Sequence, residues 1–144
     1  MKGVIAIING PNINLTGERE TGIYGADSLE GINRAIEEHA RALGLECSFF
    51  QSNSEGAIID RLHAMRHECD GVIINAGAYT HTSIALQDCI RSLKCPVIEV
   101  HISNVHKREE FRHHSMISCA CLGVIAGFGL DSYRLAIEAI VKAR

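Results

Sequence analysis

Short apolar runs alternate with amphipathic segments along the whole chain, and this alternation limits the fold more than any other feature. Runs of about four to eight apolar residues between turn signals are typical of buried strands. The segments between them repeat their apolar residues with the period of a helix. Buried strands separated by helices indicate a parallel sheet that is covered on both faces. The five expected strands span residues 4–8, 45–50, 71–75, 96–101 and 119–126.

This pattern predicts the α/β class, as a flavodoxin-like, doubly wound, five-stranded parallel sheet with helices on both faces. Residues 1–144 show no linker, repeat or low-complexity tract, so we expect a single catalytic domain. Asp27, with Glu30 three residues later, has the pattern of a capping box for the first helix, which would end at Gly44. The candidate caps of the later helices are Asn53 or Ser54, Thr82 or Ser83, and Asp131.

Charge and hydropathy exclude several classes of function. The net charge is −3, so the chain lacks the positive excess of a nucleic-acid-binding or membrane-surface protein. No apolar run approaches the ~20 residues of a membrane span, and Asn9 and Gly10 interrupt any leader pattern early. We therefore expect a cytoplasmic protein without a nucleic-acid or membrane partner.

The cysteine and histidine content does not have the spacing of a metal site. Six cysteines occur without a C-x-x-C pair, and in a cytoplasmic chain they are expected to be reduced, buried small hydrophobes. Cys119 and Cys121 lie in an apolar run, where we expect them to pack rather than to bind metal. His106, His113 and His114 lack the spacing of a zinc motif. We therefore expect no metal ion.

A loop of about fifteen residues follows the first strand, and loops of this length usually have a function. It includes Asn12, Arg19 and Tyr24 among several glycines. A nearby cation favours tyrosinate, so Arg19 would lower the pKa of Tyr24 from its usual ~10. The pair would then act as a base on a lid that completes the site when it closes.

Polar residues follow three of the expected strands, where ligands bind in parallel α/β sheets. Asn12 follows the first strand, Asn75 ends the third, and His101 and Ser103 lie at the end of the fourth. Amide side chains bind hydroxyls or carboxylates, and helix N-termini or exposed backbone N–H groups hold anions. The expected ligand is a small, hydroxylated anion.

Two pairs in these loops allow both a functional and a structural interpretation. Glu99 and His101 lie two apart on one strand and therefore share a face, so Glu99 is placed to orient His101 as a general acid. The alternative is a purely structural contact. Arg108 and Arg112 are four apart, as on one turn of a short helix, and either clamp a substrate or form a solvated face.

Four short motifs in this order resemble the type II 3-dehydroquinate dehydratases, nearly end to end. They are residues 9–14, Gly17 to Gly25 with Arg19 and Tyr24, residues 75–83 and residues 99–104. Thr16 replaces a common Leu, and Thr21 replaces the Pro that usually follows the Arg-Glu pair. The loss of that proline would loosen the lid without changing the chemistry.

The resemblance implies dehydration of 3-dehydroquinate to 3-dehydroshikimate through an enolate. The pathway would be the shikimate route of aromatic amino acid biosynthesis, or quinate catabolism. Tyr24 would be the base beside Arg19, and Asn12 would hold the water that stabilises the enolate. His101, oriented by Glu99, would protonate the departing hydroxyl.

The resemblance implies no metal and no organic cofactor. It also implies the substrate contacts and the assembly. Asn75, Ile102 and Ser103 would bind the carboxylate, and Gly77 would be a further contact. His81 and Arg112 would hold ring hydroxyls, and Arg108 would add positive charge near the base. Asp88 would reach into the site of a neighbouring subunit in a homododecamer of four trimers.

Two other classes of function are compatible with the fold alone. A flavodoxin-like FMN or small-anion module would need a Ser/Thr/Gly-rich phosphate loop after the first strand, where this chain has Pro11 and Asn12. A regulatory or scaffold domain would leave Arg19, Tyr24 and His101 unexplained.

Overall fold

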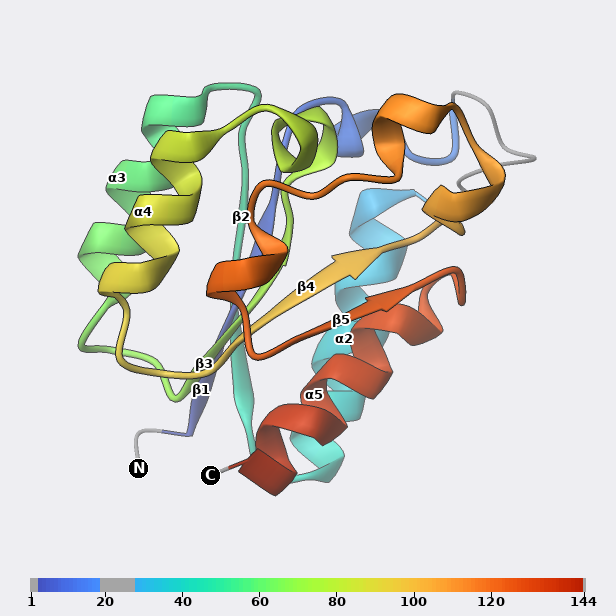
Figure 1. Ribbon diagram of the computed structural model, residues 1–144. Helices are drawn as coiled ribbons and strands as arrows, with labels where there is room; N and C mark the ends of the chain where they lie inside the picture. The colour runs from blue at the N-terminus through green and yellow to red at the C-terminus, as the bar shows by residue number, and fades with distance from the viewer. Residues whose placement is uncertain (1–2, 19–27, 144) are drawn as a thin grey trace.

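Five parallel strands form one sheet in the computed structural model, which describes residues 3–18 and 28–143 (Figure 1). The strand order is β2-β1-β3-β4-β5, which confirms the flavodoxin-like topology. Such a sheet changes direction of winding beside β1, where ligands bind in folds of this type. The strands are β1 (Val4–Asn9), β2 (Glu46–Gln51), β3 (Gly71–Asn75), β4 (Val97–His101) and β5 (Gly123–Ala126).

Two helices cover each face of the sheet. Helices α2 (Leu29–Ala42) and α5 (Asp131–Ala143) pack on one face, and α3 (Glu55–Met65) and α4 (Ile84–Ser92) pack on the other (Figure 1). Within β1, Ile5 and Ile7 face the first pair of helices, whereas Ala6 and Ile8 face the second. This alternation explains why β1 is apolar from Val4 to Ile8, since both of its faces are covered by helices. No helix within the described ranges is long and apolar enough to cross a membrane.

Serine side chains cap three of the helices. The N-cap of α2 is Ser28, whose Oγ accepts a hydrogen bond from Gly31 N at 3.2 Å, so the prediction of Asp27 was wrong. Both residue types are good caps, and local sequence alone does not separate neighbours. Ser54 and Ser83 cap α3 and α4, which selects one of the two alternatives in each case. Helix α5 already includes Asp131 as its first residue.

The fifth strand is shorter than predicted. Residues Ser118–Ala120 form a 3₁₀ helix, and β5 begins only at Gly123. The expectation that all six cysteines are buried also fails here, because Cys119 is exposed. The Ser115 and Ser118 hydroxyls hydrogen-bond to Glu99 on β4 and hold the chain in a turn before β5 begins. The apolar sequence of this segment does not indicate those two contacts.

Candidate functional site

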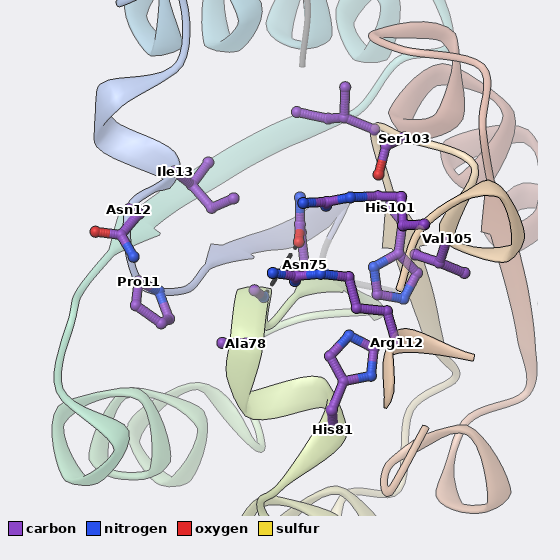
Figure 2. A pocket seen from close by; sticks show the side chains of 13 residues that line it. Pro11, Asn12, Ile13, Asn75, Ala78, His81, His101, Ser103, Val105 and Arg112 are labelled. Carbon is purple, nitrogen blue, oxygen red and sulfur yellow. Dashed lines mark hydrogen bonds between the residues drawn. The ribbon is translucent and has the colours of Figure 1, made fainter. Parts of the chain in front are cut away.

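A crevice lies at the carboxyl ends of β1, β3 and β4, as the fold predicts (Figure 2). The side chains of Asn75, His101, Ser103 and Arg112 converge on it from three segments of the chain: the end of β3, the end of β4 and the 3₁₀ helix at residues 110–112. The lining residues are Pro11, Asn12 and Ile13 after β1; Asn75, Gly77, Ala78 and His81 around β3; and His101, Ile102, Ser103, Val105, Arg108 and Arg112 after β4.

Two glycines let the loops after β1 and β3 meet backbone to backbone. Gly10 N donates a hydrogen bond to Asn75 O at 2.7 Å, and a Cβ on Gly10 would lie only 2.4 Å from Ala76 O. Gly77 has a φ of +58°, and a Cβ there would lie 3.0 Å from Pro11 O. Any larger side chain would therefore push the two loops apart. The crevice depends on this close approach.

Asn12 lies at the mouth of the crevice in the left-handed region, with a φ of 68°. Asparagine tolerates this conformation better than most other residues. Asn12 N donates to Asn53 Oδ1 at 3.0 Å, so a side chain of the loop after β2 fixes the turn. Arg19 and Tyr24, the expected cation and base of this loop, lie outside the described residues.

Glu99 and His101 form a buried hydrogen-bonded pair, and the contact predicted from strand alternation is confirmed. His101 Nε2 lies 2.5 Å from Glu99 Oε2, and their side chains are 8% and 2% exposed. The second carboxylate oxygen, Oε1, accepts hydrogen bonds from Ser115 Oγ at 2.8 Å and Ser118 Oγ at 2.7 Å. Sequence spacing gave no signal for these two serines. Three donors thus hold one buried carboxylate.

These contacts set the charge of Glu99. Burial alone would raise the pKa of Glu99, but the hydrogen bonds from His101, Ser118 and Ser115 outweigh it and lower that pKa below its usual value. The ionised carboxylate can only accept, so His101 Nε2 has the hydrogen of this bond. His101 Nδ1 has no hydrogen-bond partner within residues 3–18 and 28–143. The ring therefore has one nitrogen fixed and one free for a ligand.

His81 presents a second imidazole to the crevice. Its ring stacks on that of His101, with centroids 6.4 Å apart and planes at 16°. Burial, with the nearby charges of His101 and Arg112, lowers the pKa of His81, which favours the neutral ring. His81 Nδ1 lies 2.8 Å from His114 O, a carbonyl that can only accept, so Nδ1 has the hydrogen. Nε2 is therefore an acceptor suited to a ligand hydroxyl.

A buried relay fixes the side chain of Asn75. Tyr133 Oη donates to Asn9 Oδ1 at 2.6 Å and accepts from Asn75 Nδ2 at 3.1 Å. Asn75 Oδ1 accepts from Gly77 N at 3.3 Å, and Tyr133 is fully buried. Because Asn75 Nδ2 has two hydrogens, one stays available to a ligand. Tyr133 belongs to α5, and no local motif predicted its contact with this site.

Two arginines line the crevice, but not on one helical turn. The expected turn was wrong, because Val105–Lys107 and Glu110–Arg112 form two separate 3₁₀ helices. Arg112 Nε donates to Glu109 Oε2 at 2.7 Å, and Arg108 Nε lies 3.9 Å from the same oxygen. The Arg112 guanidinium has five donors, and Glu109 is its only side-chain hydrogen-bond partner within residues 3–18 and 28–143. The crevice is therefore cationic on this side, as an anionic ligand requires.

The remaining expected ligand-binding residues divide into two groups. Gly77, Ile102 and Ser103 line the crevice. Asp88 is exposed on α4 and is not part of this lining, so its expected contact with another subunit stays a prediction. The described ranges contain no group of three or more His, Cys, Asp or Glu side chains placed to bind a metal ion.

The sequence matches one protein family over nearly its whole length. The model of the family "Dehydroquinase class II" matches residues 3–141. A 3-dehydroquinate dehydratase of Jannaschia sp. (strain CCS1) is 54% identical over 138 residues, covering 96% of this chain and 93% of the relative. One of Caldicellulosiruptor bescii is 54% identical over 141 residues, covering 97% of each chain.

Solved structures of similar proteins agree with this match. The type II dehydroquinase of Butyrivibrio crossotus superposes with a TM-score of 0.94 at 45% identity, covering 96% of this chain and 97% of the other. The type II dehydroquinase of Propionibacterium acnes superposes with a TM-score of 0.94 at 39% identity, covering 99% of this chain and 98% of the other. A 3-dehydroquinate dehydratase-like protein from Bifidobacterium longum superposes with a TM-score of 0.73 at 27% identity, covering 96% of this chain and 95% of the other.

Proposed function

Because this chain belongs to the class II dehydroquinase family, we propose that it removes water from 3-dehydroquinate in the crevice at the carboxyl ends of β1, β3 and β4. The observation that supports this most is the buried Glu99–His101 pair, whose free ring nitrogen belongs to a residue of the crevice wall. The alternative of an FMN or small-anion module finds no comparable support, given a family match over residues 3–141.

The reaction divides into two proton transfers. The ketone of 3-dehydroquinate acidifies the neighbouring C–H, so a base removes the C2 proton and the electron pair moves into an enolate. The enolate then collapses, the C–O bond to the leaving hydroxyl breaks, and an acid supplies one proton to release water. The product, 3-dehydroshikimate, is a conjugated enone.

His101 is the proposed acid of the second step. The Glu99 carboxylate stabilises the imidazolium, in which Nδ1 has a proton to donate. Loss of that proton to the leaving hydroxyl returns His101 to the neutral form, with Nε2 still bonded to Glu99. The hydroxyls of Ser115 and Ser118 keep Glu99 ionised and hold it in place.

Tyr24 is the proposed base of the first step, as a tyrosinate stabilised by Arg19. Asn12 would hold the water that donates a hydrogen bond to the enolate oxygen, and its place at the mouth of the crevice supports this role. Arg108, which also lines the crevice, would add positive charge near the base. Without a nearby cation, a tyrosine with its usual pKa of about 10 would stay protonated at neutral pH and could not act as a base.

The remaining residues would bind the substrate in the ground state. Asn75 Nδ2, the Ile102 backbone and Ser103 would bind the carboxylate, with Gly77 as a further contact. Arg112 and His81 Nε2 would hold ring hydroxyls, the first as donor and the second as acceptor. We also propose that Asp88, exposed on α4, contacts the site of a neighbouring subunit in a dodecamer. Sedimentation of the native protein measures that assembly.

The proposal is tested by adding 3-dehydroquinate to the purified protein and following the ultraviolet absorbance of the conjugated enone. We expect absorbance to rise catalytically, and Ser103→Ala to raise KM. Ser92→Ala is the matched control, since Ser92 Oγ donates to Cys89 O at 2.6 Å, away from the crevice. A protein that is folded and forms no enone at any pH would contradict the proposal.

A further inference from the structure

Two free thiols lie in contact at the amino ends of β3 and β4, which is the end of the parallel sheet opposite the crevice. Cys69 precedes β3 and Cys95 precedes β4, and these two strands are neighbours in the sheet. Their Sγ atoms are 3.9 Å apart, the only Sγ–Sγ contact among the described residues. Val72 N donates to Pro96 O at 3.0 Å, so the two chain segments are hydrogen-bonded one residue after Cys95 and three residues after Cys69.

We propose that Cys69 and Cys95 form an oxidation site, which low-molecular-weight disulfides convert reversibly to an intramolecular disulfide. Neighbouring strands lie about 4.8 Å apart, inside the Cα–Cα range of disulfides, about 4.4–6.8 Å. The two sulfurs must close from 3.9 Å to about 2.05 Å, so each side chain moves by about 1 Å.

The two thiols have different environments. Cys95 is partly exposed, whereas Cys69 is buried and its Sγ lies 3.4 Å from Met65 O. The hydrogen bond from Cys69 lowers the pKa of the Cys95 thiol to about 7, and the same contact, with burial, raises the pKa of Cys69. Cys95 is therefore the accessible thiolate and the first nucleophile.

The exchange proceeds in two balanced steps. The Cys95 thiolate attacks one sulfur of the oxidant, which forms a mixed disulfide and releases one thiolate. Cys69 then loses its proton to solvent and attacks Cys95 Sγ, and the second thiolate of the oxidant leaves. Two protein thiols are oxidised and one small disulfide is reduced to two thiols. The mixed disulfide removes the Cys95 charge, which removes one cause that disfavours ionisation of Cys69.

The other cysteines are less suited to this reaction. Burial raises the pKa of Cys47 to about 11 and that of Cys121 to about 12, and it also raises the pKa of Cys89. Cys119 is exposed, and Arg91 Nη2 lies 3.3 Å from its sulfur. Cys119 has no second thiol in contact within the described residues, so it should stop at a mixed disulfide. It therefore reports whether the oxidant has reached the protein.

The test treats the native protein with oxidised glutathione, blocks remaining thiols by alkylation, and maps the peptides by mass spectrometry. We expect a linked peptide containing Cys69 and Cys95, which reduction with dithiothreitol removes. Cys69→Ser should stop at a glutathione adduct on Cys95, whereas Cys95→Ser should leave Cys69 free. Cys89→Ser, a second buried thiol on α4, is the matched control and should keep the Cys69–Cys95 link.

Two results would overturn the proposal. One is complete alkylation of Cys69 and Cys95 after Cys119 has fully reacted with the oxidant. The other is a linked peptide that joins any other pair of cysteines. If the link forms, the thermal unfolding midpoint should rise by about 10 °C, because the disulfide closes a loop in the unfolded chain across a separation of 26 residues. An unchanged midpoint in the linked protein would contradict a bond that fits the native geometry.

Discussion

Replacing Glu99 by Gln tests whether the buried pair supports His101 as the acid. The substitution keeps the shape of the side chain and leaves an oxygen to accept from Ser115 and Ser118, but it removes the negative charge. If the amide nitrogen faces His101, it donates to Nε2 and fixes the neutral ring. The imidazolium then loses its partner, and a neutral imidazole is a much weaker acid.

The size of the effect follows from the contact that is lost. Glu99 Oε2 and His101 Nε2 are 2.5 Å apart with both side chains buried, so this is a charge-assisted hydrogen bond shielded from water. Such bonds contribute about 1.5–3 kcal/mol. If the pair acts mainly in the transition state, kcat should fall about 10- to 100-fold, at about 1.4 kcal/mol for each factor of ten.

The assay is the steady-state rate of enone formation as a function of pH. Glu138→Gln is the matched control, since Glu138 Oε1 also pairs with a histidine, His39 Nε2, at 3.0 Å but outside the crevice. It should keep kcat within about twofold. Ser118→Ala removes only one hydrogen bond to Glu99 and should cost less than about tenfold.

Stability should respond to pH in a defined direction. The folded pKa of Glu99 is lowered, so its stabilising contribution is present above the unfolded value, about 4.3, and is lost as the pH falls through the folded pKa. Glu99→Gln should lack this part of the acid dependence.

A Glu99→Gln variant with wild-type kcat at every pH would refute the idea that Glu99 supports the acid.

Three further predictions concern the relay, the lid and the reaction type. Tyr133→Phe leaves Asn75 Nδ2 and Asn9 Oδ1 without their partner, so the free energy of unfolding should fall by about 1–3 kcal/mol. KM should rise by a larger factor than kcat falls, because Asn75 would lose its position. Chemical denaturation and steady-state kinetics measure the two effects, and an unchanged KM would contradict the positioning role. Tyr24→Phe should abolish turnover while a bound product still protects the fold against heat, and Arg19→Ala should shift the basic limb of the pH profile; more than a few per cent of the wild-type kcat in Tyr24→Phe would remove that base. Borohydride with substrate should add no mass to any lysine and chelators should leave the rate unchanged, whereas a reduced adduct would indicate a Schiff base.

The fold was predictable because the apolar periods are strong. Strands buried on both faces are apolar along most of their length, as β1 and β3 are up to the asparagine that ends each of them, so their positions follow from sequence alone. The start of β5 was not predictable from sequence. Residues 119–122 are apolar, but the path of the chain there depends on the hydrogen bonds of Ser115 and Ser118 to Glu99. A strong apolar pattern therefore predicts where the central strands lie, whereas tertiary contacts determine where β5 begins.

The site was predictable where its contacts are local or lie at strand ends. Glu99 and His101 are two residues apart, so alternation on β4 was enough to pair them. Tyr133 lies 58 residues from Asn75 and 124 from Asn9, and no periodic pattern links such positions. Its short distances to both asparagines arise only when α5 packs on the sheet. Long-range polar contacts therefore need the structure.

The most direct test of the proposed mechanism separates the two proton transfers in His101→Ala. The variant is incubated with 3-dehydroquinate in deuterated water, and both enone formation and deuterium at C2 of recovered substrate are measured. Because His101 acts after the C2 proton has left, elimination should slow far more than exchange, and Glu99→Gln should give a milder version. If exchange and elimination both persist at wild-type rates, His101 is not the acid, and His81 on the same wall of the crevice becomes the candidate.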